Sequence, residues 1–170
     1  MARTSLQDVR SLGDPLQQYN WDVIFTRLPG TADVKPFTFK AMTTSIPGML
    51  LESVPAALHG IELRYAGRAN YSHQLPITFM EHRDVSTRDM LLKWHRSARD
   101  WITNTGSYKN AYGVTIQMLL YDDIPQVVRN IFIYGCWPET VDDAAVDGQT
   151  SGIVQVSCTL SYDYFEDADV

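Results

Sequence analysis

The sequence has few cysteines, no surplus of positive charge and no long apolar run, and each shortage excludes a class of protein. Two cysteines in 170 residues cannot form a disulfide-rich scaffold. We interpret Cys136 and Cys158, which lie inside apolar strand-like runs, as buried thiols in a reducing compartment; a disulfide between neighbouring strands is the alternative. The formal net charge of -6 argues against a protein that binds nucleic acid through a basic surface.

Membrane and secretion signals are also missing. No stretch approaches the ~20 consecutive apolar residues of a membrane helix, and the opening MARTSLQDVRSLGDPLQQ lacks the apolar segment of a secretory signal. We therefore expect synthesis in the cytosol and no membrane anchor. The hydrophobic content of 45% suffices for a substantial core, and the length fits one domain over 1–170 with a loosely held N-terminal arm at 1–18.

Motifs for catalysis are absent as well. The sequence contains no Gly-rich phosphate loop, no H-E-x-x-H zinc motif and no G-x-S-x-G nucleophile motif. His59 and Glu62 lie three residues apart in a predicted strand, so their side chains point to opposite faces and make a poor metal pair. We therefore expect no catalytic residue, no metal, no cofactor and no enzyme, although a Cys–His pair assembled in space is left open.

What the chain does have is a succession of alternating strands around one helix. Period-two alternation predicts strands at 19–28, 37–46, 59–68, 73–83, 112–122, 127–137 and 152–165. An acidic loop is expected at 138–152, before the last of them. This succession is typical of a mainly β protein, a small β-sandwich or barrel of about seven or more strands with one flanking helix.

The helix is predicted at 86–104 and ends at Gly106. Apolar side chains recur along it at helical spacing, namely Met90, Leu91, Trp94, Ala98, Trp101 and Ile102. Its outer face carries four cations, Arg88, Lys93, Arg96 and Arg99. An ordinary solvated face is one interpretation, and a docking surface for an acidic partner is the other.

The last predicted strand is unusual in its length and in its polar face. Residues 152–165 would span roughly 45 Å at ~3.3 Å per residue, well beyond a usual strand. One face is apolar, from Val154 to Tyr164, and seals a core. The other face has no Lys, Arg or Glu and consists of Gln155, Ser157, Thr159, Ser161 and Asp163. Such a face is as suited to lining a passage as to facing bulk water.

The ordered succession of segments resembles the tail tube proteins of bacteriophages with contractile tails, which are related in fold to the type VI secretion tube protein. The resemblance covers roughly residues 19 to 166. The segments that carry it are YNWDVIF, FKAMTTSIPG, LHGIELRYAGRANYSHQLPITFMEHRD, LLKWHRSARDW and YGCWPETV…VQVSCTLSYDYFE.

The resemblance implies a structural virion protein whose hexameric rings stack into the inner tail tube. Strands of neighbouring subunits would join edge to edge into a barrel around a lumen, the conduit for genome ejection. The implied partners are further copies of the chain, a tail sheath protein, a baseplate tube initiator, a tape-measure protein and DNA in transit without specific binding. The protein would be made and assembled in the host cytoplasm and reside in the phage tail.

Three surfaces follow as hypotheses. The first is a bore lined by Thr115, Gln117, Gln155, Ser157, Thr159, Ser161 and Asp163. The second is a protruding, proline-interrupted loop at 47–58 that contacts the next subunit or ring through Met49, Leu50, Leu51 and Val54, which are too apolar to remain in water. The third is a sheath contact through the cationic helix face or the acidic loop at 139–149.

Three other functions are compatible with these patterns. One is a baseplate tube initiator that forms a single ring. Another is the tube of a phage-derived injection particle. The third, from a different class, is a ligand-binding β-barrel, which would need a closed apolar pocket.

Overall fold

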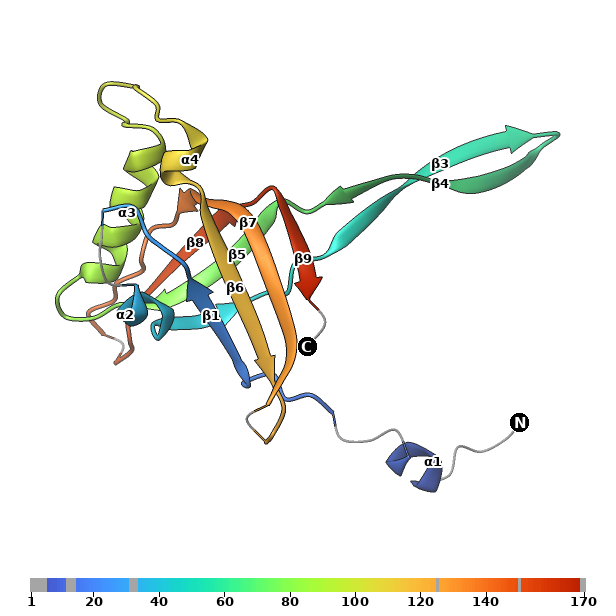
Figure 1. Ribbon diagram of the computed structural model, residues 1–170, viewed down its shortest axis with the longest axis horizontal. Helices are drawn as coiled ribbons and strands as arrows, with labels where there is room; N and C mark the ends of the chain where they lie inside the picture. Colours follow the sequence, from blue (N-terminus) through green and yellow to red (C-terminus); the bar gives the residue numbers. More distant parts are fainter. Residues whose placement is uncertain (1–5, 12–14, 31–33, 125, 150, 169–170) are drawn as a thin grey trace.

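Nine strands and four helices form the part of the chain that the computed structural model describes (Figure 1). That part excludes residues 1–5, 12–14, 31–33, 125, 150 and 169–170. The elements are α1 (Leu6–Arg10), β1 (Trp21–Phe25), α2 (Lys35–Thr38), β2 (Ala41–Thr44), β3 (Met49–Leu58), β4 (Ile61–Tyr71), β5 (Gln74–Met80), α3 (Ser86–Ala98), α4 (Lys109–Tyr112), β6 (Val114–Tyr121), β7 (Val127–Val141), β8 (Gln155–Ser161) and β9 (Tyr164–Ala168). The predicted mainly β fold is confirmed. Part of the predicted N-terminal arm at 1–18, namely residues 1–5 and 12–14, lies outside the described residues.

Seven strands form one sheet that folds over itself into a sandwich. Its order is β1-β6-β7-β8-β5-β2, and β9 pairs with β7. In Figure 1, β1, β6 and β9 lie in one layer, whereas β8 and β5 lie behind them. The long β7 belongs to both layers, because its first part pairs with β6 and β9 and residues 137–141 pair with β8.

The bend in β7 occurs at Gly135. This residue has φ +69°, a conformation that glycine adopts without the steric cost other residues incur. The carboxylate of Asp163 lies against it, so that a Cβ at position 135 would fall 2.2 Å from Oδ2. The chain after β8 is interrupted at the same corner, at Tyr162 and Asp163, before β9 begins. The prediction of one continuous strand over 152–165 is therefore wrong, although both strands follow the same side of β7.

The core fills the space between the two layers. Alternate residues of β1, β5, β6, β7 and β8 are buried there, including Phe25, Phe79, Ile116, Ile133 and Leu160. The alternation is strict in β6 and β8, where Val156, Cys158 and Leu160 are buried and the residues between them are not. Aromatic rings pack against one another at the centre of the core. Phe25 contacts Phe37 edge to face, with 5.0 Å between ring centroids.

Several predicted boundaries are wrong for identifiable reasons. Residues 37–46 do not form one strand, because Lys35–Thr38 make a helical turn in which Phe37 is buried and only Ala41–Thr44 pair. The strand predicted at 59–68 covers Ile61–Tyr71 instead, because β4 pairs with β3 along that length. The loop expected at 138–152 begins later, because β7 continues through Val141.

Helix α3 is shorter than predicted, because it ends at Ala98 rather than near Gly106. Leu91 and Trp94 are fully buried, as their spacing indicates, but Trp101 and Ile102 lie beyond the helix and are exposed. The helix starts after Val85, and Ser86 makes no capping box with Asp89. The carboxylate of Glu81 caps the N-terminus of the helix instead. It accepts hydrogen bonds from the backbone N–H groups of Thr87 at 3.1 Å and Arg88 at 2.9 Å.

Replacing Glu81 should lower the free energy of unfolding by an amount that depends on pH. Partial burial raises the pKa of Glu81, but the backbone N–H groups of Arg88, Thr87 and His82 outweigh it, and the pKa lies below its usual 4.5. Because the folded-state pKa is depressed, the stabilisation is present above the unfolded pKa and is lost as pH falls through the folded value. Glu81→Gln should cost about 1 kcal/mol at pH 7. Urea unfolding at pH 7 and at pH 3 checks this, and a deficit of equal size at both would contradict it.

Candidate functional site

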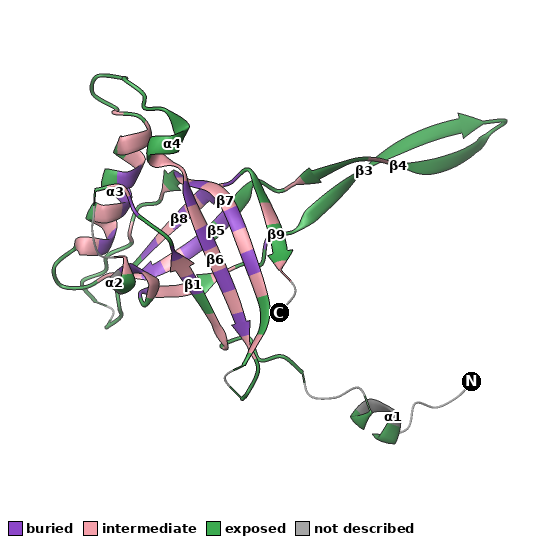
Figure 2. Cartoon of the chain, in the orientation of Figure 1, coloured by how far each residue is buried: buried purple, intermediate pink, exposed green. Residues whose placement is uncertain are grey.

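A β-hairpin built from β3 and β4 projects far from the sandwich and is exposed along nearly its whole length (Figures 1 and 2). We call residues 49–71 the arm, which is a different segment from the N-terminal residues 1–18. The segment expected as an irregular loop at 47–58 is therefore mostly a regular strand, and that expectation is wrong. His59 and Gly60 form the turn with φ of +51° and +81°, which is typical of the tight two-residue hairpin turn.

The outer half of the arm has one apolar face. Successive cross-strand pairs of the hairpin point alternately to an apolar face and to a polar face. The pairs Leu58–Ile61, Ala56–Leu63 and Val54–Tyr65 share one face, because side chains alternate along a strand. The opposite face has Glu62, Arg64 and small residues, and Arg64 Nη2 lies 3.1 Å from Glu62 Oε1. The large apolar side chains are 46–66% exposed, so the chain alone leaves a contiguous apolar patch in water.

The outward face of β2, β5, β8 and the end of β7 is mostly polar, since seven of the nine residues in its cross-strand rows are polar and none is charged. Its cross-strand rows are Thr43–Thr78–Ser157, Pro76–Thr159–Thr140 and Gln74–Ser161–Trp137. We call these nine residues the uncharged face. Hydroxyl groups pair across it, with 3.1 Å between Thr78 Oγ1 and Ser157 Oγ. The acidic Glu139 lies beside it at a bulge of β7, and none of the nine residues is a cation.

The predicted bore residues do not all lie on this face. Ser157, Thr159 and Ser161 do, and Gln155 continues the same alternation opposite Met80. Thr115 and Gln117 point outward from β6 in the other layer, where Gln117 donates to Asn130 Oδ1 at 3.0 Å. Asp163 sits at the corner between layers and forms an ion pair with Lys109. The structure thus separates these three from the uncharged face.

The outward face of β6, β7 and β9 differs in character. Tyr134 stacks on Tyr164, with ring centroids 4.7 Å apart, and donates to Glu166 Oε2 at 3.1 Å. Desolvation and the Glu166 carboxylate raise the pKa of Tyr134. Arg129 pairs with Asp167 at 2.9 Å, but both follow the alternation of Ile131 and Phe165 and therefore lie on the core side of their strands, at the end of the sheet. This second face therefore presents a tyrosine stack and the Glu166 carboxylate, where the uncharged face presents mainly hydroxyl groups.

Both edges of the layer that carries the uncharged face lack a neighbouring strand. Among the described strands, β2 pairs only with β5, and residues 137–141 of β7 pair only with β8. Unpaired backbone N–H and C=O groups at such an edge favour pairing with another chain.

The predicted sheath-contact residues lie on or just after α3. Lys93, Arg96 and Arg99 are exposed and Arg88 is half-buried. Arg96 lies over the Trp101 ring, 4.3 Å from its centroid, and Arg99 Nη1 donates to Asn104 Oδ1 at 3.0 Å. These contacts order two of the cations but leave them at the surface.

Neither cysteine is placed for thiolate chemistry. Both cysteines are free and buried, and desolvation raises the pKa of each thiol to about 12, which makes thiolate chemistry inaccessible at neutral pH. No group of metal-ligating side chains occurs in the described part of the chain. Among the described residues, none of the helices combines the length and hydropathy that a membrane crossing requires.

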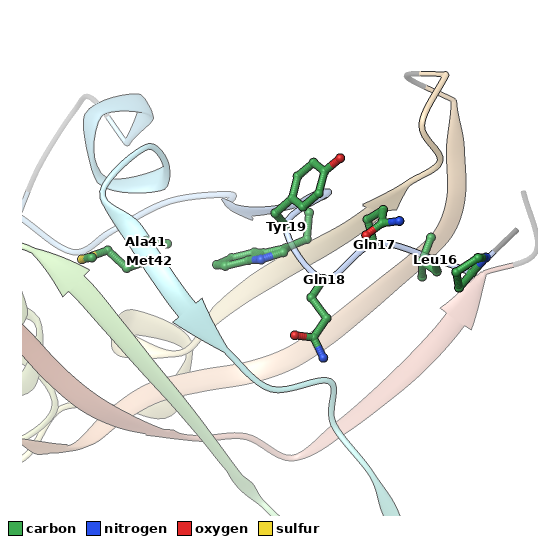
Figure 3. A pocket seen from close by; sticks show the side chains of 8 residues that line it. Leu16, Gln17, Gln18, Tyr19, Ala41 and Met42 are labelled. Carbon is green, nitrogen blue, oxygen red and sulfur yellow. The ribbon is translucent and has the colours of Figure 1, made fainter.

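The seam between β1 and β2, where the sandwich stays open, holds a shallow pocket (Figure 3). It lies between the segment 15–19 and β2. Gln18 and Tyr19 point to opposite sides in this view, so their polar groups do not converge on one point. A ligand-binding barrel would need a closed apolar cavity with convergent polar groups, which this seam does not provide.

Solved structures with a similar fold include a component of a contractile injection system. The chain matches a protein in the sheath–tube complex of the extracellular contractile injection system PVC, with a TM-score of 0.63 at 12% identity over 99% of this chain and 100% of that one. It also matches Hcp1 from Salmonella typhimurium, with a TM-score of 0.51 at 13% identity over 89% and 87% of the two chains. At these identities the likeness establishes the fold.

Sequence comparison establishes the family. The family model described as phage tail tube protein matches residues 16–167, and the tail tube protein gp19 of Enterobacteria phage T4 is 25% identical over 133 residues, covering 76% of this chain and 81% of gp19. The chain therefore belongs to the phage tail tube protein family, and the resemblance in its sequence is confirmed. It is a structural component of a phage tail, from a family of tube proteins rather than enzymes.

Sequence reasoning missed the apolar face of the arm beyond Val54. Leu58, Ile61, Leu63 and Tyr65 belong to it, and the alternation in IELRY after the His-Gly turn was the signal that could have revealed them. It also grouped Thr115 and Gln117 with residues of the uncharged face, from which the structure separates them, because alternation shows that a residue points outward without showing from which layer.

Proposed function

We propose that six copies form a ring around a lumen, that rings stack into the inner tail tube, and that the uncharged face lines the bore through which the genome leaves. The observation that supports this is the uncharged face, whose nine residues include no cation and are mostly hydroxyl-bearing. Cations on a bore would hold DNA phosphates by releasing counterions, whereas hydroxyl and amide groups keep the wall wet without holding a polyanion.

The free edges of the same layer provide the lateral contact. We place β2 of one copy beside residues 137–141 of the next, so that each subunit contributes four strands to a common barrel. Closure around the ring would pair backbone groups that remain unpaired in the single chain. Gln155 lies at the end of the uncharged face, and Asp163, Thr115 and Gln117 lie away from it.

The remaining surfaces suit the other partners of a contractile tail. The arm, with Met49, Leu50, Leu51 and Val54 near its base and middle, contacts a neighbouring subunit. The cations Arg88, Lys93, Arg96 and Arg99 face outward to the sheath. The tape-measure protein and then DNA occupy the lumen, a baseplate initiator nucleates the first ring, and assembly takes place in the host cytoplasm.

Adding positive charge to the proposed bore tests this assignment. We expect Ser157→Lys together with Thr159→Lys to leave tube length and diameter unchanged but to slow DNA ejection at least tenfold at low salt, since each new phosphate contact strengthens binding. The measurement is ejection of labelled genome from phage that carry the variant. High salt should restore the rate.

The matched control puts lysines on the other layer. Thr115→Lys with Gln117→Lys adds the same charge to an outward strand face and should not change the ejection rate. If the control pair slows DNA ejection and the Ser157 and Thr159 pair does not, the other layer lines the bore and the proposed assignment is wrong.

A further inference from the structure

Two patches of complementary character lie at opposite ends of β6. Helix α4 and Gly113 come directly before the strand, and residues 122–124 follow it. Figure 1 shows α4 at one end of the body and the turn between β6 and β7 at the other. We call residues 122–124 the acidic tip, and we call the cavity beside α4 the aromatic pocket.

The acidic tip consists of Asp122, Asp123 and Ile124. All three are exposed, and Ile124 leaves 75% of its surface in water. The turn has a defined shape, because Asp122 N donates to Gln126 O at 3.0 Å and Asp122 Oδ1 accepts from Asp123 N at 2.7 Å. The tip therefore presents one large aliphatic side chain next to two carboxylates.

The aromatic pocket lies between the segment that follows α3 and the strand β7. It encloses about 510 Å³, a volume within the range of ligand pockets. The rings of Trp101, Tyr112 and Trp137 line it, and Tyr112 meets Trp137 edge to face, with ring centroids 6.1 Å apart. Trp101 is 52% exposed. Aromatic walls that remain open to water on one side suit an apolar side chain from another molecule.

The aromatic pocket has a cationic rim. Arg99 lines the pocket and is exposed. Arg96 lies over the Trp101 ring, 4.3 Å from its centroid. The neighbouring Asp100 is turned into its own loop, where Oδ1 accepts from the backbone N–H of Ile102 at 2.7 Å. The rim can therefore pair with carboxylates of another chain.

The pocket and the tip lie beside the two free edges of the layer that carries the uncharged face. Trp137 is the first residue of the edge at 137–141, and it lines the pocket. Leu120, near the end of β6, lines the open seam together with Met42 and Thr44 of β2, which is the other edge. Lateral pairing of these edges would thus bring the acidic tip of one copy to the aromatic pocket of the next.

We propose that the acidic tip of one copy docks in the aromatic pocket of the neighbouring copy in the same ring. Ile124 enters between the aromatic rings, and Asp123 pairs with Arg99. This rests on the proposed function, which places β2 of one copy beside β7 of the next. The contact is head to tail, since different patches of the same chain meet, and it closes after six copies. Arg99 then meets the neighbouring copy, whereas Arg88 and Lys93 remain for the sheath.

Charge and apolar area both favour a second copy as the occupant. The tip carries two carboxylates and the rim carries two guanidinium groups, so each copy offers the counterpart of its own patch. Docking would remove Ile124 and Trp101 from water, which is the main source of affinity. The ion pairs at the rim would contribute less to affinity, but they would fix the orientation and exclude other partners.

Cross-linking of assembled tubes tests the contact. Ile124→Cys in the tip and Ser107→Cys in the pocket lining are combined in one chain, and tubes are treated with a short bismaleimide. The native thiols are buried and should not react. We expect a ladder of linked chains that ends at six, and a ladder at least tenfold weaker when Asp89→Cys, at the start of α3, replaces Ser107→Cys. A ladder that continues past six, or none from intact tubes, would overturn the proposal.

Charge reversal gives an independent test in solution. Asp123→Arg and Arg99→Asp should each raise the concentration needed for ring formation at least tenfold, because like charges would then meet at the rim. The double variant should return to within threefold of the unaltered protein, and thermal unfolding checks that each single chain is folded. Unchanged assembly of both single variants, or no recovery in the double variant, would contradict the proposal. If the unaltered protein forms neither rings nor tubes with a baseplate present, the proposed function itself fails, which separates the two outcomes.

Discussion

Replacing Leu50 and Leu51 together by aspartate should abolish polymerisation and leave the single chain folded. Both side chains are more than 60% exposed in the single chain, so the change should alter the free energy of unfolding by no more than ~0.5 kcal/mol. In a subunit contact the carboxylates would be buried without partners, at a cost of several kcal/mol each. At ~1.4 kcal/mol per factor of ten, the concentration needed for assembly should rise more than 100-fold.

Sedimentation measures polymerisation, and thermal unfolding measures whether the single chain remains folded. The matched control is Ser53→Asp with Ala57→Asp, which adds the same charge to the polar face of the arm and should still polymerise. Unaltered tube formation by the Leu50 and Leu51 variant would show that the arm does not contact a neighbour. Loss of the monomer's unfolding transition would show that the arm supports the fold instead.

The largest effect on folding is expected from Trp94→Ala. The indole is fully buried, meets Phe25 edge to face with ring centroids 6.3 Å apart, and donates from Nε1 to the backbone oxygen of Tyr112 at 2.8 Å. Removing it leaves a large cavity and an unpaired carbonyl, which should cost about 3–5 kcal/mol. The Tm should fall by roughly 6–20 °C, at ~2–4 °C per kcal/mol for a chain of this size.

Trp101→Ala is the matched control for this substitution. Periodicity places both tryptophans on one helical face, but Trp101 is 52% exposed and contacts chiefly Arg96. Its loss should cost no more than about 1 kcal/mol. Equal Tm losses in the two variants would show that the helix extends as its sequence spacing indicates, with Trp101 in the core.

Periodicity predicted the parts of the fold in which a strand has one buried and one open face. The buried set Val156, Cys158 and Leu160 and the helix residues Leu91 and Trp94 lie where spacing places them. It failed where the chain bends. Nothing in the pattern of 152–165 shows that the glycine at 135, 28 positions away from Asp163 in sequence but adjacent in space, interrupts the strand.

The arm was only half predicted because local apolarity does not show strand pairing. Met49, Leu50 and Leu51 stand out as an apolar run, but Pro55 argues against a central strand. A free-standing hairpin tolerates the proline because it has no third strand.

A cryo-electron microscopy map of tubes grown from the purified protein, with a baseplate added if nucleation requires it, tests the central claim most directly. The account predicts a hollow tube of stacked rings in which Ser157, Thr159 and Ser161 face the lumen and Tyr134 and Tyr164 face away from it. A tube whose lumen is lined by the tyrosine face, or a protein that stays monomeric under these conditions, would contradict it.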